Sequence, residues 1–182
     1  LLDPCDPFHA LAGSIRRQKP EVKDIEIVAI PEPTHNIFLE EDWSRPTYLD
    51  YQLRHMESDD ELEMIKGGRK YRQYRLAEGI NLDLFLVYDA AQWGVIYLIR
   101  TGPWEFSRWM VTQRNLGGAL PSNAYVKDGL LRVGGRYDYN ETNDSMEWTG
   151  GEIVPILEEV DYFRLCRMEY IEPAERRPMW RR

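Results

Sequence analysis

The sequence predicts an α+β fold, because short apolar runs typical of strands occur in the same chain as stretches with helical spacing. Runs of four to eight residues that end at Gly, Pro or Asp predict strands. Apolar residues three and four positions apart predict helices. The expected strands are residues 8–12, 24–30, 70–76, 80–87 and 125–133, and the expected helices lie at 47–65, 89–98, 104–114 and within 153–168.

The length and composition fit one compact domain or two tightly joined subdomains. The chain has 182 residues, of which 43% are hydrophobic and 12% aromatic, so it can bury a substantial core. Its formal charge of −8 is unexpected for a protein that binds nucleic acid without a partner, because non-specific affinity for nucleic acid comes mainly from Lys and Arg side chains that neutralise phosphates. A local basic face remains compatible with this net charge.

The cysteines and the hydropathy indicate an intracellular protein. Cys5 and Cys166 are far apart and have no metal-type spacing, which favours a reducing compartment, either cytoplasm or nucleus. We find no signal peptide and no apolar stretch long enough to cross a bilayer, so no membrane partner is expected. The first residue is Leu1, so a preceding region is an open possibility.

The stretch 13–30 carries the chemistry. In a strand, Asp24 and Glu26 point to one side and Ile25 to the other. Two neighbouring carboxylates repel each other and raise each other's pKa unless a cation lies beside them. Oxygen-only ligands favour Mg²⁺ or Mn²⁺ over Zn²⁺. The preceding Gly13-Ser14 turn and Arg17 suit a phosphate chain, so the stretch predicts a metal-dependent nucleotidyl-transfer site.

The next predicted elements include a strand that contains a third carboxylate, Asp83. Residues 47–65 show helical spacing, and Ser58 is expected to split them into two helices by capping the second. Residues 70–76 and 80–87 predict a hairpin with Glu78-Gly79 in its turn. Asp83 lies in the most apolar strand, where an unpaired charge is costly. Either a structural ion pair or a metal-ligand role explains it.

The second half predicts a tight turn followed by a helix. A Thr101-Gly102-Pro103 turn precedes residues 104–114, in which Phe106 and Trp109 are expected to pack in the core. Gly117-Gly118 is expected to end this helix, and residues 134–151 predict a polar loop or hairpin. The basic cluster 176–182 is expected either to contact phosphates or to be a disordered chain end.

These motifs, in this order, resemble the polymerase beta-like nucleotidyltransferases, and most closely the family X DNA polymerases. The resemblance runs nearly the full length of the chain. Gly13-Ser14-x-Arg16-Arg17 with Asp24-x-Glu26 is similar to the family's signature. The other matching segments are 66–71, the turn before the last palm strand; 82–85, that strand; Thr101-Gly102 with Phe106; and 158–176, the C-terminal segment.

The resemblance implies a nucleotidyltransferase palm over residues 1–93, with a mixed β-sheet and flanking helices, and a small α/β thumb-like subdomain over residues 94–182. It implies two Mg²⁺ ions, replaceable by Mn²⁺, on the catalytic carboxylates of Asp24, Glu26 and Asp83. The nucleoside triphosphate is expected at Gly13, Ser14, Arg17, Lys23, Thr101, Gly102, Phe106 and Ser107. Nucleic acid, as a DNA primer end or gapped DNA, is expected at Lys66, Lys70, Arg108 and Arg114.

Three positions depart from the family pattern. Glu26 stands where the family X polymerases have Asp, although Asp-x-Glu is similar to antibiotic-type nucleotidyltransferases of the same superfamily. Lys23 replaces a Gly and either contacts phosphate or faces solvent. Ile99-Arg100 replaces two aromatic residues that crowd the 2′ position of the sugar, which predicts relaxed discrimination against ribonucleotides.

The sequence therefore predicts nucleotidyl transfer to a 3′-hydroxyl, as in a minimal family X-like DNA polymerase for repair or gap filling. One alternative is a nucleotidyltransferase that modifies a small molecule, RNA or protein. Another is an inactive binding module of the same fold. Because the net charge is negative, we expect the isolated chain to bind DNA weakly. We therefore also expect a partner protein or a further DNA-binding region to strengthen the binding.

Overall fold

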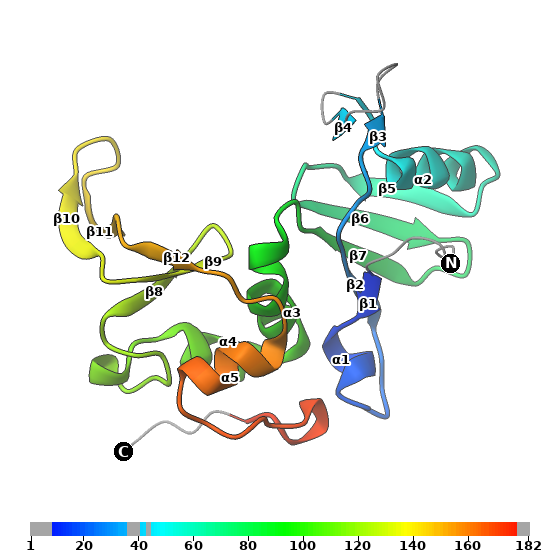
Figure 1. Cartoon of the computed structure of the whole chain (residues 1–182). Coiled ribbons are helices and arrows are strands. Elements are labelled where there is room, and N and C mark those ends of the chain that lie inside the picture. The colour runs from blue at the N-terminus through cyan, green and yellow to red at the C-terminus, as the bar shows by residue number, and fades with distance from the viewer. Residues whose placement is uncertain (1–8, 36–40, 43–44, 178–182) are drawn as a thin grey trace. The chain divides into compact units, whose positions relative to one another are not determined.

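The computed structural model describes residues 9–35, 41–42 and 45–177, and the chain divides into two compact units (Figure 1). Unit 1 is Leu1–Tyr88 and unit 2 is Asp89–Arg182. The division falls after Tyr88, whereas the sequence analysis placed a boundary after residue 93. The roles expected for the two parts, palm and thumb, stay predictions.

Unit 1 contains a mixed five-stranded sheet in the order β1-β2-β7-β6-β5. Only the central pair, β2 and β7, is parallel, and its outer neighbours are antiparallel. A four-residue helix, α1 (Gly13–Arg16), connects β1 to the loop before β2. The strands are β1 (His9–Leu11), β2 (Asp24–Ala29), β5 (Leu62–Lys66), β6 (Tyr71–Leu76) and β7 (Asn81–Leu86), with a separate short pair, β3 (Thr34–His35) and β4 (Glu41–Asp42).

Helix α2 (Tyr48–Ser58) covers one face of this sheet (Figure 1). It begins with a capping box, in which the Thr47 hydroxyl accepts from the Asp50 amide and the Asp50 carboxylate accepts from the Thr47 amide. Leu49 and Leu53 pack in a core with the alternate residues of the central strands, including Ile27, Leu82, Leu84 and Leu86. Because strand side chains alternate, the residues between these apolar ones belong to the opposite face.

The predicted second helix after Ser58 is wrong. Helix α2 ends at Ser58, whose hydroxyl donates to the His55 carbonyl, and Asp60 adopts a left-handed φ of 59° that turns the chain. Residues 62–66 then form strand β5. Leu62 is buried and the four following residues are exposed, so the apolar positions that fitted a helix belong to an edge strand with one anchoring residue.

Unit 2 packs three helices and a small sheet around its own core. The helical elements are η1 (Ala90–Gln92), α3 (Trp93–Thr101), α4 (Trp104–Val111), η2 (Arg114–Leu116), α5 (Glu159–Leu165) and η3 (Pro173–Glu175). The strands are β8 (Ala124–Lys127), β9 (Leu130–Val133) and β12 (Glu152–Val154), in the order β12-β9-β8, and the hairpin β10 (Arg136–Asn140) with β11 (Ser145–Thr149). The core includes Val95, Leu98, Phe106, Met110, Leu131, Tyr162 and Phe163.

Two expectations for unit 2 need correction. The single strand expected over 125–133 is a hairpin, because Asp128 and Gly129 both adopt positive φ and make a tight turn. The helix expected to run to Arg114 ends at Val111, and Gly117 terminates only the short η2. For residues 134–151, the hairpin alternative is the one observed.

The unit 2 core encloses a buried ion pair and a thiol. The Arg176 side chain is fully buried and donates to the Glu159 carboxylate at 2.8 Å. Cys166 is a free cysteine inside this core, and Cys5 lies outside the described residues. Within the described ranges, no helix is long and apolar enough to cross a membrane.

Candidate active site

The parallel pairing of β2 and β7 brings the three predicted carboxylates to one face of the unit 1 sheet. Glu26 lies directly opposite Asp83 in the register, and Asp24 lies two residues before Glu26, opposite Asn81. All three side chains are partly buried. Ile25 and Ile27 pack toward the α2 side, as the alternation in the sequence predicts. The carboxylates therefore line the face that α2 does not cover.

Two neutral side chains on β6 hold the third carboxylate. The Tyr71 hydroxyl donates to Asp83 Oδ1 at 2.7 Å, and the Gln73 amide donates to the same oxygen at 2.9 Å. Gln73 is the register partner of Asp83, and the Tyr71 ring stacks on Phe85. Two hydrogen bonds to one carboxylate oxygen fix the orientation of the side chain.

The contacts of Tyr71 and Gln73 with Asp83 were not predicted from the sequence. The signal was present in the hairpin turn, because a turn at Glu78-Gly79 sets the register of β6 against β7. That register places Gln73 beside Asp83. A search for donors at alternate positions of the preceding strand would have found both residues.

Gly13 brings the backbone against the carboxylate of Glu26. The Ala12 amide donates to the Glu26 carbonyl at 2.8 Å, which fixes the entry to α1 beside β2. Gly13 has a left-handed φ of 58°, and a Cβ added there would lie 1.6 Å from Glu26 Oε2. Only glycine fits this position without a shift of the neighbouring carboxylate.

Ser14 supplies a polar atom without a partner at the same place. Its Oγ is buried and has no hydrogen-bond partner within the described residues. A hydroxyl whose partner is a ligand oxygen would look like this when the ligand is not bound. Arg17 follows on the same turn and is partly buried, while Lys23 is exposed just before β2. The predicted phosphate-binding residues of unit 1 are thus neighbours of the carboxylate face in sequence and in structure.

The donor chemistry of the face suits a hard divalent cation, because its candidate ligands are all carboxylate oxygens. In the part of the chain that the structure describes, however, no three His, Cys, Asp or Glu side chains are grouped closely enough to hold a metal ion. The strand register aligns Asp24, Glu26 and Asp83, but the side chains do not converge on one point. A bound cation would have to draw them together, so the two-metal site stays a prediction.

The unit 2 residues expected to bind nucleotide are placed mainly inside the unit. Thr101 ends α3 and is fully buried, and Gly102 follows it as the C-cap. Phe106 is fully buried in the core, and the Ser107 hydroxyl donates to the Ile99 carbonyl at 2.7 Å. The Phe106 ring therefore cannot reach a ligand, and the Ser107 hydroxyl already makes a hydrogen bond to a carbonyl in the last turn of α3.

The basic residues expected to contact nucleic acid divide into two groups. Lys66, Lys70 and Arg108 are exposed on the surfaces of their units. Arg114 instead donates through Nη2 to the carbonyls of Ala119 and Cys166, so part of its guanidinium has a structural role. The basic tail lies outside the described residues beyond position 177, and Arg176 is buried rather than available to phosphates.

Comparison with known proteins adds no assignment. No protein family profile matches the chain. No curated protein sequence matches it at a significant level. The site is therefore interpreted from its residues and from the motif resemblance alone.

Proposed function

We propose that this protein transfers a nucleotidyl group from a nucleoside triphosphate to a 3′-hydroxyl, in the manner of a minimal family X DNA polymerase. The observation that carries the proposal is the alignment of Asp24, Glu26 and Asp83 on one sheet face. Gly13 packs against one of these carboxylates, and the unpartnered Ser14 hydroxyl follows it. The motif order along the chain supports the same proposal.

The carboxylates have distinct roles in this proposal. Asp24, Glu26 and Asp83 would hold Mg²⁺, which would lower the pKa of the acceptor hydroxyl and stabilise charge on the leaving pyrophosphate. Asp83 takes the acceptor side, as the resemblance implies. Tyr71 and Gln73 both donate to its Oδ1 and so hold the carboxylate in one orientation.

The turn between β1 and α1 would bind the triphosphate. Ser14 offers a hydroxyl that has no other partner among the described residues, and Arg17 offers a guanidinium from the same turn. Lys23, exposed just before β2, adds a positive charge next to Asp24. Positioning and charge neutralisation are what phosphoryl-type transfer needs from a protein.

The test is a transfer assay with Mg²⁺, labelled ribo- and deoxyribonucleoside triphosphates, and a panel of acceptors. The panel contains primer–template DNA, gapped DNA, single-stranded DNA and RNA. We expect extension of a DNA 3′ end, and a loss of at least about a hundredfold in Asp83→Asn. Comparable use of both sugars would support the hypothesis drawn from Ile99-Arg100.

The matched control is Asp60→Asn. Asp60 is exposed after α2 at a φ of 59°, a conformation that Asn tolerates well. The control should keep full activity and stability. Absence of transfer to every acceptor, in a correctly folded wild type with Mg²⁺ or Mn²⁺, would reject the proposal in favour of a non-catalytic binding module.

A further inference from the structure

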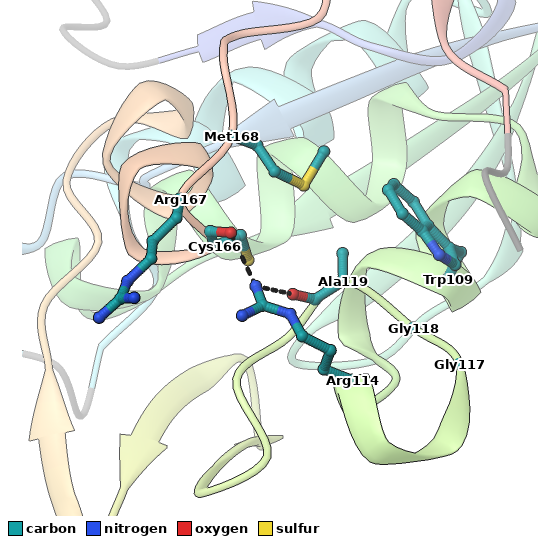
Figure 2. Close-up of a pocket in the computed structure, with 8 residues that line it drawn as sticks. All are labelled: Trp109, Arg114, Gly117, Gly118, Ala119, Cys166, Arg167 and Met168. Carbon is teal, nitrogen blue, oxygen red and sulfur yellow. Dashed lines mark hydrogen bonds between the residues drawn. The ribbon is translucent and has the colours of Figure 1, made fainter. Parts of the chain in front are cut away.

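Unit 2 contains a pocket of about 410 Å³ that the proposed transfer reaction does not use (Figure 2). Its wall is formed by Trp109 of α4, by the turn from Arg114 through Gly117-Gly118, and by the end of α5 at Cys166 and Arg167. All of these residues belong to one compact unit. The pocket is therefore a property of unit 2 alone.

The lining is positively charged in a chain that is negative overall. Two arginines and no carboxylate line the pocket, while the whole chain carries a formal charge of −8. A concave surface of one charge sign attracts ligands of the opposite sign. The lining therefore selects anions over cations and neutral molecules.

Two hydrogen bonds fix the Arg114 guanidinium, and most of its N–H donors make no hydrogen bond within the described residues. Figure 2 shows its guanidinium bonded to the carbonyls of Ala119 and Cys166, and both bonds come from Nη2, at 3.1 and 2.9 Å. A guanidinium has five N–H donors. In the described part of the chain, the donors on Nη1 and Nε of Arg114 have no partner. The two carbonyl bonds thus fix a cation whose remaining edge can meet a ligand.

Trp109 provides a second, independent sign of a ligand. Only 5% of this residue is exposed, and its indole Nε1 is buried without a hydrogen-bond partner among the described residues. Buried donors of this kind are rarely left unsatisfied in proteins. Because Trp109 also lines the pocket, a bound ligand whose oxygen reached this N–H would satisfy it.

Arg167 occupies its position at a conformational cost. It follows the C-cap of α5 with a φ of 54°, where helices favour glycine. Its side chain has no ion-pair or hydrogen-bond partner within the described residues, so no internal contact explains why an arginine stands there. Strained backbone is often found at binding sites, where the side chain serves the ligand.

We propose that this pocket binds a terminal phosphate group, either free or as a phosphomonoester. Arginine donors match phosphate oxygens, and a phosphate offers enough acceptors for two guanidinium groups and an indole N–H together, whereas a carboxylate offers only two oxygens. The phosphate can belong to free phosphate, to a mononucleotide or to the end of a nucleic-acid strand. The lining residues all belong to unit 2, whereas the carboxylate face belongs to unit 1, and the proposal does not depend on catalysis there.

The test follows the indole N–H signal of Trp109 by NMR in the full-length ¹⁵N-labelled protein, with the signal assigned from Trp109→Phe. The probes are inorganic phosphate, adenosine monophosphate, and one short oligonucleotide with either a 5′-phosphate or a 5′-hydroxyl, all at constant ionic strength set with chloride. We expect a saturable shift with the probes that carry a terminal phosphate group, which are inorganic phosphate, adenosine monophosphate and the 5′-phosphorylated oligonucleotide. The tightest of them identifies the source of the phosphate.

Two variants separate binding from folding. Arg167→Gly should weaken phosphate binding about tenfold, because it removes one charge-assisted contact, and should keep or raise the melting temperature, because glycine accepts the left-handed φ. Arg164→Ala removes a charge from the exposed side of α5 without touching the pocket, and should leave affinity within about twofold. A shift that does not saturate, equal weakening in both variants, or equal binding of the 5′-hydroxyl oligonucleotide would overturn the proposal.

Discussion

Glu26 on β2 and Asp83 on β7 lie directly opposite each other in the only parallel pair of the five-stranded sheet. The strand register therefore decides which acidic residues share a sheet face, and the proposed chemistry depends on that. A register shift of one residue would move the carboxylates of one strand to the side covered by α2 and expose its apolar residues. The α2 core therefore fixes the register, and the register fixes which acids share a face.

Gly13→Ala should damage both stability and activity. A left-handed φ costs a residue with a Cβ about 1–2 kcal/mol, and the added carbon would also collide with the Glu26 carboxylate. We expect the free energy of unfolding in urea to fall by more than about 2 kcal/mol and nucleotidyl transfer to be lost. The matched control is Gly79→Ala, where φ is 84° but nothing lies within 4 Å of the added carbon. Similar losses in the two variants would contradict a specific contact at Glu26.

Tyr71→Phe should slow transfer without preventing nucleotide binding. The change removes the hydroxyl that donates to Asp83 but keeps a ring to stack on Phe85. We expect kcat to fall about three- to tenfold, the equivalent of roughly 1 kcal/mol, with KM for the nucleotide nearly unchanged. Tyr125→Phe, which loses a hydroxyl bond to the Gly150 carbonyl in unit 2, is the control. An equal effect of both variants on kcat would mean that Tyr71 has only a structural role.

The central strands could be predicted from the sequence because their signals are local and agree with one another. The apolar run at 24–30 ends at prolines, and the Glu78-Gly79 turn, with a φ of 84° at Gly79, joins two strands of matching pattern. From these elements the shared side of Asp24 and Glu26 followed directly. The pairing of Glu26 with Asp83 did not, because it depends on which strands become neighbours in the sheet.

Other features depend on tertiary context that the pattern does not contain. Leu62 and Ile65 fit a helix as well as a strand, and the left-handed Asp60 decides between them. Helical spacing predicted that Phe106 packs in the core, which is confirmed, but the sequence could not show that the Ser107 hydroxyl, in a segment matched to nucleotide binding, bonds to the Ile99 carbonyl. The Tyr71 contact with Asp83 likewise requires the hairpin register.

Arg176→Met should strongly destabilise unit 2. The Arg176 side chain is fully buried, the Glu159 side chain is only 4% exposed, and removal of the arginine would leave this buried carboxylate without its cation. We expect a loss of about 3–5 kcal/mol in urea unfolding, with much of it recovered in Arg176→Met/Glu159→Leu. The exposed pair of Arg164 and Asp161 is the control, and Asp161→Asn should change stability by less than about 1 kcal/mol. A small effect of Arg176→Met alone would contradict this assignment.

Cys166 should be unreactive in the folded protein and should contribute to alkaline unfolding. Burial raises the pKa of its thiol to about 12, and burial also raises the pKa of the Tyr162 hydroxyl well above its usual range. Because the folded state holds these protons more tightly than the unfolded state, stability is complete below about pH 9 and declines as the pH rises toward 12, by at most about 1.4 kcal/mol per pH unit for each group.

The measurement uses Cys5→Ser, which leaves Cys166 as the single cysteine. Urea unfolding from pH 8 to pH 11 should show the decline, and a thiol reagent at pH 8 should react only as fast as the protein unfolds. Cys166→Ala should flatten part of the pH dependence. Rapid modification of the native protein at pH 8 would contradict the burial of the thiol.

The most direct test of the proposed site is to locate a bound Mn²⁺ ion by paramagnetic broadening of amide signals in the ¹⁵N-labelled protein. A divalent ion on the unit 1 sheet face should broaden the signals of Asp24, Glu26 and Asp83 first, at Mn²⁺ concentrations far below that of the protein. The same titration of Asp24→Asn/Asp83→Asn should leave these signals sharp. First broadening at another acidic segment, such as residues 57–63, or unchanged broadening in the double variant, would contradict a metal site on this face.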